Sequence, residues 1–179
     1  MSKIQAAPSR MRPEVAAISV KQRQGRAANA VAELLMRKLL VPKIYIQPRG
    51  FPSERPIEGV IAVAGDRAGS GDIYAVDLIL DRAEAIGSTK LLKKFLDLIP
   101  AHFRYLAVDS SSIDYVSKQR LFAEDGIGRI GVIEIIESPT SPPEARIVIP
   151  AERFRLDQRW IKKFDNFQKK TPADMEFRG

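Results

Sequence analysis

The stretch that decides the fold runs from Pro56 to Lys94. It opens with Pro56-Ile-Glu-Gly-Val-Ile-Ala-Val63, passes through a turn rich in Gly and Asp, and continues as Gly71-Asp-Ile-Tyr-Ala-Val-Asp-Leu-Ile-Leu80. Two short apolar runs joined by a glycine-containing turn predict a pair of adjacent strands, at residues 59–64 and 73–80. A helix capped by Ser88 follows and ends before Pro100.

Each of the two strands carries one carboxylate, Glu58 and Asp77. Because the strands lie side by side, we expect both acids to point into one site. Carboxylate oxygens are the ligands that Mg²⁺ prefers, and a bound Mg²⁺ polarises a phosphate and activates water. In the competing interpretation, the two acids pair with arginines or cap turns.

The rest of the chain continues this alternation of helices and strands. The predicted elements are a helix at 22–40, strands at 43–47, 103–108 and 129–137, a helix opened by Ser110 or Ser111 and broken at Gly126-Ile-Gly128, an edge strand at 146–149, and a last helix capped by Asp157. The order predicts an α/β fold, a mixed central sheet flanked by helices with an αβββαβαβ core and a C-terminal strand and helix extension. We divide the chain into a basic N-terminal arm at 1–21, a core domain at 22–137 and an extension packed on it at 138–179.

Composition excludes several kinds of site. The chain has no Cys and one His, so disulfides, thiolate metal sites and multi-histidine zinc sites are ruled out. No apolar run approaches the ~20 residues needed to span a bilayer, and the first residues lack the apolar core of a secretory signal. We therefore expect no membrane partner and a cytoplasmic protein.

The order of elements, with acids on the second and third strands, resembles the restriction-endonuclease-like (PD-(D/E)xK) nuclease superfamily. The resemblance covers roughly residues 22–136. The segment Pro56-Ile57-Glu58-Gly59 matches the family's Pro-Asp motif, and Val76-Asp77-Leu78-Ile79 matches its acid-any-Lys motif, with Ile79 where the lysine belongs.

The resemblance implies roles for further residues. Glu58 and Asp77 become the catalytic acids that bind Mg²⁺, and Lys90 or Lys94, on the helix after Asp77, resembles a lysine that has migrated in some branches. Asn29 and Glu33 stand near the position of a first-helix Glu. Family members often dimerise, which makes a homodimer an expectation by analogy alone.

The net charge of +7 favours polyanion partners, because Lys and Arg release counterions from phosphates. We expect nucleic acid, with DNA favoured by the resemblance, to contact basic side chains on the predicted helices: Arg23, Arg26, Arg37, Lys93, Lys94, Lys162 and Lys163. Trp160 and Phe164, interleaved with these lysines, can stack on bases, although helical spacing favours an apolar face docked on the core. His102 is interpreted as a structural residue, because no Ser or Cys partner accompanies it.

Three functions stay open at this point. The first is a nucleic-acid-binding protein of nuclease fold with a degraded or atypical active site, since Ile79 removes a donor that stabilises developing charge. The second is an active Mg²⁺-dependent DNA endonuclease, a hydrolase whose lysine is Lys90 or Lys94. The third is a scaffold or interaction module that binds neither metal nor nucleic acid.

Overall fold

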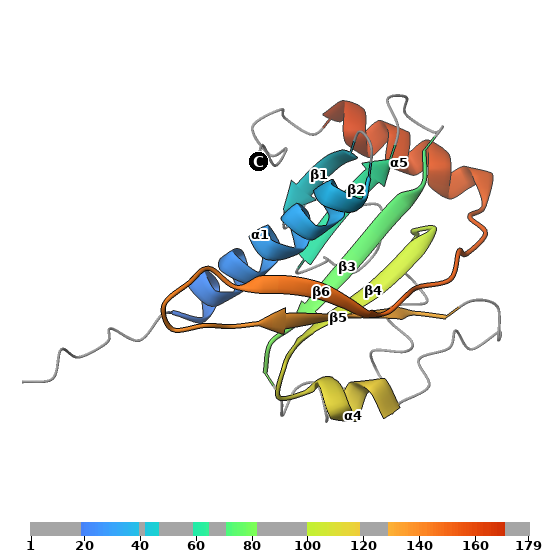
Figure 1. Ribbon diagram of the computed structural model, residues 1–179. Coiled ribbons are helices and arrows are strands. Elements are labelled where there is room, and N and C mark those ends of the chain that lie inside the picture. The colour runs from blue at the N-terminus through green and yellow to red at the C-terminus, as the bar shows by residue number, and fades with distance from the viewer. Residues whose placement is uncertain are drawn as a thin grey trace, which may run out of the picture.

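A mixed β-sheet forms the centre of the computed structural model, which describes residues 19–39, 42–46, 59–64, 71–81, 100–118 and 129–170. Within these residues six strands follow one another across the sheet in chain order (Figure 1). The strands are β1 (Pro42–Ile46), β2 (Gly59–Ala64), β3 (Ile73–Ile79), β4 (Phe103–Asp109), β5 (Gly131–Ile136) and β6 (Glu144–Ile149). Neighbouring strands are antiparallel from β1 to β3, parallel from β3 to β5, and antiparallel again between β5 and β6. The predicted α/β architecture with a mixed sheet is therefore confirmed.

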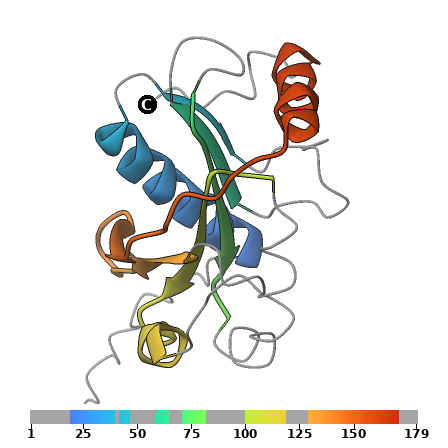
Figure 2. The same cartoon turned by 90° about the vertical axis from the view of Figure 1, so that its right-hand side faces the viewer.

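Helices cover both faces of this sheet. Helix α1 (Val20–Lys38) lies on one face and α5 (Gln158–Lys170) on the other, as the edge-on view in Figure 2 shows. The short helix α4 (Ile113–Lys118) follows β4. No helix among these described elements is long and apolar enough to cross a membrane.

The alternation of side chains along the strands creates two hydrophobic clusters. On β2, Val60 and Ala62 pack with α1, whereas Ile61 and Val63 belong to the cluster that contains Phe164 of α5. Strands buried on both faces are expected to read as continuous apolar runs, and Val60–Val63 does so. The sheet is thus a middle layer, and a polar side chain on its central strands lies inside the protein.

Helix α1 begins two residues earlier than the predicted start at 22. Ser19 caps it: the Gln22 backbone N–H donates to the Ser19 hydroxyl at 3.2 Å, and the Gln22 side chain accepts from the Ser19 N–H at 3.1 Å. This reciprocal pair satisfies donors that the first helical turn leaves without partners. Positions 20 and 21, assigned to the N-terminal arm from the sequence, therefore belong to the helix.

Other boundaries differ little from the predictions. Strand β6 begins at Glu144, two residues early, and lies at the sheet edge as predicted. The cap of the last helix is confirmed, because the Arg159 N–H donates to the Asp157 carboxylate at 3.0 Å. Helix α4 begins at Ile113, after Asp109 accepts from the Ser112 N–H at 3.0 Å. The predicted helix at 88–99 and the break at 126–128 lie outside the described residues.

Candidate nucleic-acid interface

Asp77, the predicted catalytic acid of β3, is buried in the middle of the sheet. Its exposed fraction is 2%, and its backbone pairs with Gly59 on one side and Leu106 on the other. Ala75 and Ile79, two positions away on the same strand, belong to the hydrophobic cluster on the α5 side. The Asp77 side chain therefore points toward that cluster, away from α1.

Gly59 faces Asp77 across the β2–β3 pair and brings the two backbones unusually close. A Cβ at this position would lie 1.8 Å from the Val76 carbonyl oxygen and 3.3 Å from the Asp77 Cα. A backbone atom cannot move aside as a flexible side chain can, so glycine is required here. Glycine at position 59 therefore permits the close pairing of β2 with β3 next to Asp77.

The described residues include only part of the predicted active site. Glu58 and Lys90 lie outside the described residues, as do Lys93 and Lys94. Among the residues that the structure describes, no three His, Cys, Asp or Glu side chains lie close enough together to hold a metal ion. Mg²⁺ keeps several waters in its coordination shell, and a carboxylate that is 2% exposed beside Ile79 offers them no open side. The described residues do not fit a hydrated Mg²⁺, so magnesium binding stays a prediction that depends on Glu58.

The first-helix residues lie elsewhere. Asn29 and Glu33 are exposed on the outer surface of α1, on the face of the sheet opposite the one toward which Asp77 points. The sheet separates them from the acid. The structure therefore does not bring Asn29 or Glu33 together with Asp77.

Arg23, predicted to contact nucleic acid, instead joins the carboxyl ends of the three parallel strands. Its guanidinium donates to Glu137 after β5 in three contacts of 2.7, 2.8 and 3.0 Å, to the Leu80 carbonyl after β3 at 3.0 Å, and to Asp109 at the end of β4 at 3.4 Å. The hydrogen bonds to Glu137 raise the pKa of Arg23 above its ordinary value, against the opposing effect of burial. The charge of Arg23 is compensated by two acids, which weakens its attraction for phosphates.

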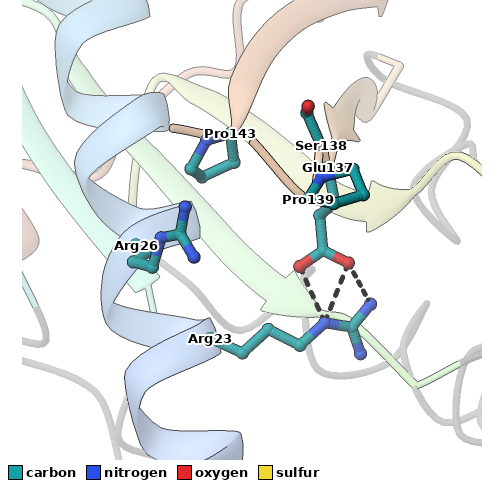
Figure 3. A pocket seen from close by; sticks show the side chains of 6 residues that line it. All are labelled: Arg23, Arg26, Glu137, Ser138, Pro139 and Pro143. Atoms are coloured by element: carbon teal, nitrogen blue, oxygen red, sulfur yellow. Dashed lines mark hydrogen bonds and ion pairs between the residues drawn. The ribbon is translucent and has the colours of Figure 1, made fainter. Parts of the chain in front are cut away.

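An open hollow of about 310 Å³ lies beside this cluster (Figure 3). Arg23 and Arg26 line it from α1, and Glu137 to Pro139 with Pro143 line it from the connection between β5 and β6. Arg26 donates to the Ser141 carbonyl at 3.2 Å. Among the described residues that line the hollow, no nucleophile is hydrogen-bonded to a base.

Helix α5, unlike Arg23, carries exposed cations that have few acidic partners. Its apolar side packs on the sheet through Phe164 and Phe167, and the Phe167 ring meets Tyr45 of β1 edge to face at 5.6 Å. Four cations on the helix and just before it are exposed: Arg155, Arg159, Lys162 and Lys163. Among the described residues, no carboxylate lies within ion-pair distance of Arg155, Lys162 or Lys163. Arg159 pairs with Asp157 at 3.3 Å, and both side chains are more than half exposed. We call these four residues the α5 basic face.

The segment between β6 and α5 is anchored to the other end of the parallel strands. Arg153 donates to Asp72 at 2.8 and 3.0 Å, and the Phe154 N–H donates to the His102 carbonyl at 2.7 Å. The His102 ring is buried and accepts from the Ile73 N–H through Nδ1 at 2.9 Å, which gives it the structural role predicted for it. Burial lowers the pKa of His102 below its ordinary value, although Asp72 opposes this shift. Polar contacts of Arg153 and Phe154, just before α5, therefore fix the position of the α5 basic face.

The predicted set of nucleic-acid contacts is split by the fold. Arg26 and Arg37 are exposed on α1, on one side of the sheet, whereas Lys162 and Lys163 are exposed on α5 on the other (Figure 2). Arg37 also donates to the Glu33 carbonyl at 3.3 Å. The fold therefore does not gather the predicted contacts on one surface.

Asp109 and Glu137 were not singled out by the sequence reasoning. Asp109 is the last residue of β4 and Glu137 directly follows β5, and polar residues at the carboxyl ends of parallel strands gather at one sheet edge in open α/β folds. Their position at strand ends was the sequence signal by which this cluster could have been found. Nothing in the sequence indicated that Arg23, more than 80 residues away, compensates both acids.

Comparison with known proteins provides a structural likeness. No protein-family model and no curated protein sequence matches the chain. A solved structure, the SPO1766 protein of unknown function from Silicibacter pomeroyi, is similar to it with a TM-score of 0.50 and 18% sequence identity. The likeness covers 82% of this chain and 84% of that one. At 18% sequence identity this likeness supports the fold and gives no information on function.

Proposed function

We propose that this chain is a nucleic-acid-binding protein that contacts phosphates through the α5 basic face and does not cleave them at Asp77. The observation that carries the proposal is the α5 basic face itself, where four exposed cations lie on or just before one amphipathic helix. Three of them have no carboxylate within ion-pair distance in the described part of the chain. Cations without acidic partners keep their full attraction for phosphates, whose counterions they release on binding.

The net charge of +7 supports the same proposal, because it draws polyanions to the protein from a distance. The placement of Asp77, which is 2% exposed beside the apolar Ile79, supports the part of the proposal that excludes cleavage at this residue. We include a cytoplasmic location in the proposal, since that compartment offers nucleic acid as a partner. The resemblance to the restriction-endonuclease-like superfamily is consistent with these points and remains a hypothesis about ancestry.

The test compares two matched double variants in fluorescence-anisotropy titrations with a labelled oligonucleotide. Lys162→Gln with Lys163→Gln removes two charges from the α5 basic face, and we expect roughly ten-fold weaker binding at low salt. Lys38→Gln with Lys118→Gln removes two exposed charges from α1 and α4 and is expected to change the affinity less than two-fold. Equal losses in both variants would mean that net charge alone, and not α5, drives binding.

A second measurement addresses catalysis. We expect no plasmid nicking with Mg²⁺ or Mn²⁺, no metal binding by calorimetry, and unchanged oligonucleotide affinity in Asp77→Asn. Metal-dependent nicking that disappears in Asp77→Asn would instead identify an active endonuclease, with Glu58 and Lys90 or Lys94 as its missing members.

A further inference from the structure

Trp160, the single tryptophan of the chain, lies in the first turn of α5. It precedes Phe164 and Phe167 by four and seven positions, which places all three on the same side of the helix. Phe164 and Phe167 are 2% and 7% exposed and belong to the hydrophobic cluster, whereas Trp160 is only half-buried and is not part of it. The indole therefore lies where the apolar side of α5 leaves the core and reaches the surface.

Two members of the α5 basic face contact this ring. The Lys163 ammonium lies 4.4 Å from the indole centroid, and the Arg159 guanidinium carbon lies 5.5 Å from it. Both distances are within the range of cation–π attraction. The Arg159 side chain is 71% exposed, and Lys163 is exposed as well. One partly open aromatic ring is thus accompanied by two cations that can reach a nearby phosphate.

This combination has the chemistry of a site for an unpaired nucleotide. Aromatic rings stack on bases of any sequence, and neighbouring cations bind the backbone phosphates. The ammonium of Lys163 is carried on a flexible four-carbon chain, so it can move from the ring to a phosphate while a base takes its place. A base inside a duplex is covered on both faces by its neighbours and cannot use the indole in this way.

We propose that Trp160, with Arg159 and Lys163, is a stacking site for an unpaired base, and that the partner of the α5 basic face is single-stranded nucleic acid. The inference rests on the proposed function and adds the class of partner. The simpler role for Trp160, in which it only covers the edge of the core, requires no difference between single strands and duplexes.

The experiment uses the full chain and the intrinsic fluorescence of Trp160, which is the only indole signal. The probes are a 12-nucleotide oligo-dT, a 12-nucleotide oligo-U and a 12-base-pair DNA duplex at low salt. We expect both single strands to quench the fluorescence and to bind more tightly than the duplex. A difference between the dT and U strands would then identify the preferred sugar.

Two variants separate stacking from stability. Neither variant contains an indole, so their affinities are measured by fluorescence anisotropy of the same probes carrying a label. Trp160→Leu is expected to weaken single-strand binding by about five- to 150-fold, the range that corresponds to loss of one stacked base, and to remove the preference over duplex. Trp160→Phe keeps a ring and is expected to recover most of the affinity. Thermal melting of both variants checks that α5 still packs on the sheet.

The outcomes are distinct. Tight binding of both nucleic-acid forms with unchanged Trp160 fluorescence, or binding of duplex alone, would overturn the stacking site and leave the proposed function in place. Failure of wild type to bind any of the three probes would overturn both. Quenching by single strands, with affinity lost in Trp160→Leu and restored in Trp160→Phe, would support both.

Discussion

Two arginine-containing regions on opposite sides of the sheet use the same side-chain chemistry in contrasting ways. Arg23 is 36% exposed and is held by two carboxylates and a backbone carbonyl. Arg159 is 71% exposed, pairs with one exposed carboxylate, and lies beside three other exposed cations. The two arginines therefore differ in their number of acidic partners, and our proposal assigns ligand binding to the one with fewer partners.

The largest expected effect on stability is at Arg23. Arg23→Ala leaves Glu137, Asp109 and the Leu80 carbonyl without their shared donor, and we expect the free energy of unfolding to fall by about 1–2 kcal/mol, a figure reduced for partial exposure. Denaturant unfolding measures it. Arg26→Ala, three positions along the same helix with one hydrogen bond to Ser141, is the control and should change stability by less than about 0.5 kcal/mol. Equal effects in the two variants would remove the distinction drawn for Arg23.

Double-mutant cycles compare the two ion pairs directly. We expect a coupling free energy of about 1 kcal/mol between Arg23 and Glu137, because the contact is bidentate and partly shielded from water. Between Arg159 and Asp157 we expect about 0–0.5 kcal/mol, since both side chains are exposed. Chemical unfolding of the single and double alanine variants gives both values. A larger coupling at Arg159 would mean that this cation also has a structural role.

We expect the stability of the protein to depend on pH through His102, which lies next to the segment that leads into α5. Because burial lowers the pKa of His102 in the folded state, the unfolded chain binds more protons as pH falls below about 6.5. The stability that neutral His102 contributes is therefore present above pH 6.5 and is lost as pH falls through the folded-state pKa. We expect a lower melting temperature at pH 5.5 than at pH 7.5 in wild type.

His102→Asn provides the control for this prediction. Its amide oxygen is attached to Cγ, as Nδ1 is in His102, so it can accept from the Ile73 N–H, yet it does not titrate. The difference in melting temperature between the two pH values should shrink in this variant. An unchanged difference would assign the pH effect to other groups.

The smallest expected effect is on the stability of the α5 basic face. Exposed lysines contribute little, and the cation–π contact of Lys163 with Trp160 lies at the surface, so Lys162→Gln with Lys163→Gln should shift the free energy of unfolding by less than about 1 kcal/mol. The same variant should lose nucleic-acid affinity. Arg23→Ala should show the reverse pattern, with lower stability and affinity within two-fold of wild type.

The sequence predicted the local elements well. The spacing of Ala27, Val31, Leu34 and Leu35 indicated α1, and the apolar run at 60–63 indicated a strand, because these patterns depend on near neighbours in the chain. The cap at Asp157 and the edge position of β6 could also be predicted from residues that are neighbours in the chain. The start of α1 was missed because Ser19, its cap, lies two turns before Ala27, where the periodic apolar pattern begins.

The candidate sites were harder to predict. The cluster of Arg23, Asp109 and Glu137 joins residues 86 and 114 positions apart, and no local pattern specifies such contacts. The split of the basic side chains between two faces of the sheet also requires the fold. Trp160 shows the limit most clearly, since helical spacing aligned it with Phe164 and could not show that the core ends before the indole.

The salt dependence of oligonucleotide affinity tests the central claim about α5 most directly. We expect the logarithm of the association constant of wild type to fall linearly with the logarithm of salt concentration, and the slope to lose about one to two units in the Lys162→Gln, Lys163→Gln variant. The Lys38→Gln, Lys118→Gln variant should keep the wild-type slope. A wild-type affinity that does not change with salt, or a slope that the α5 substitutions leave intact, would contradict the assignment of α5 as the nucleic-acid-binding surface.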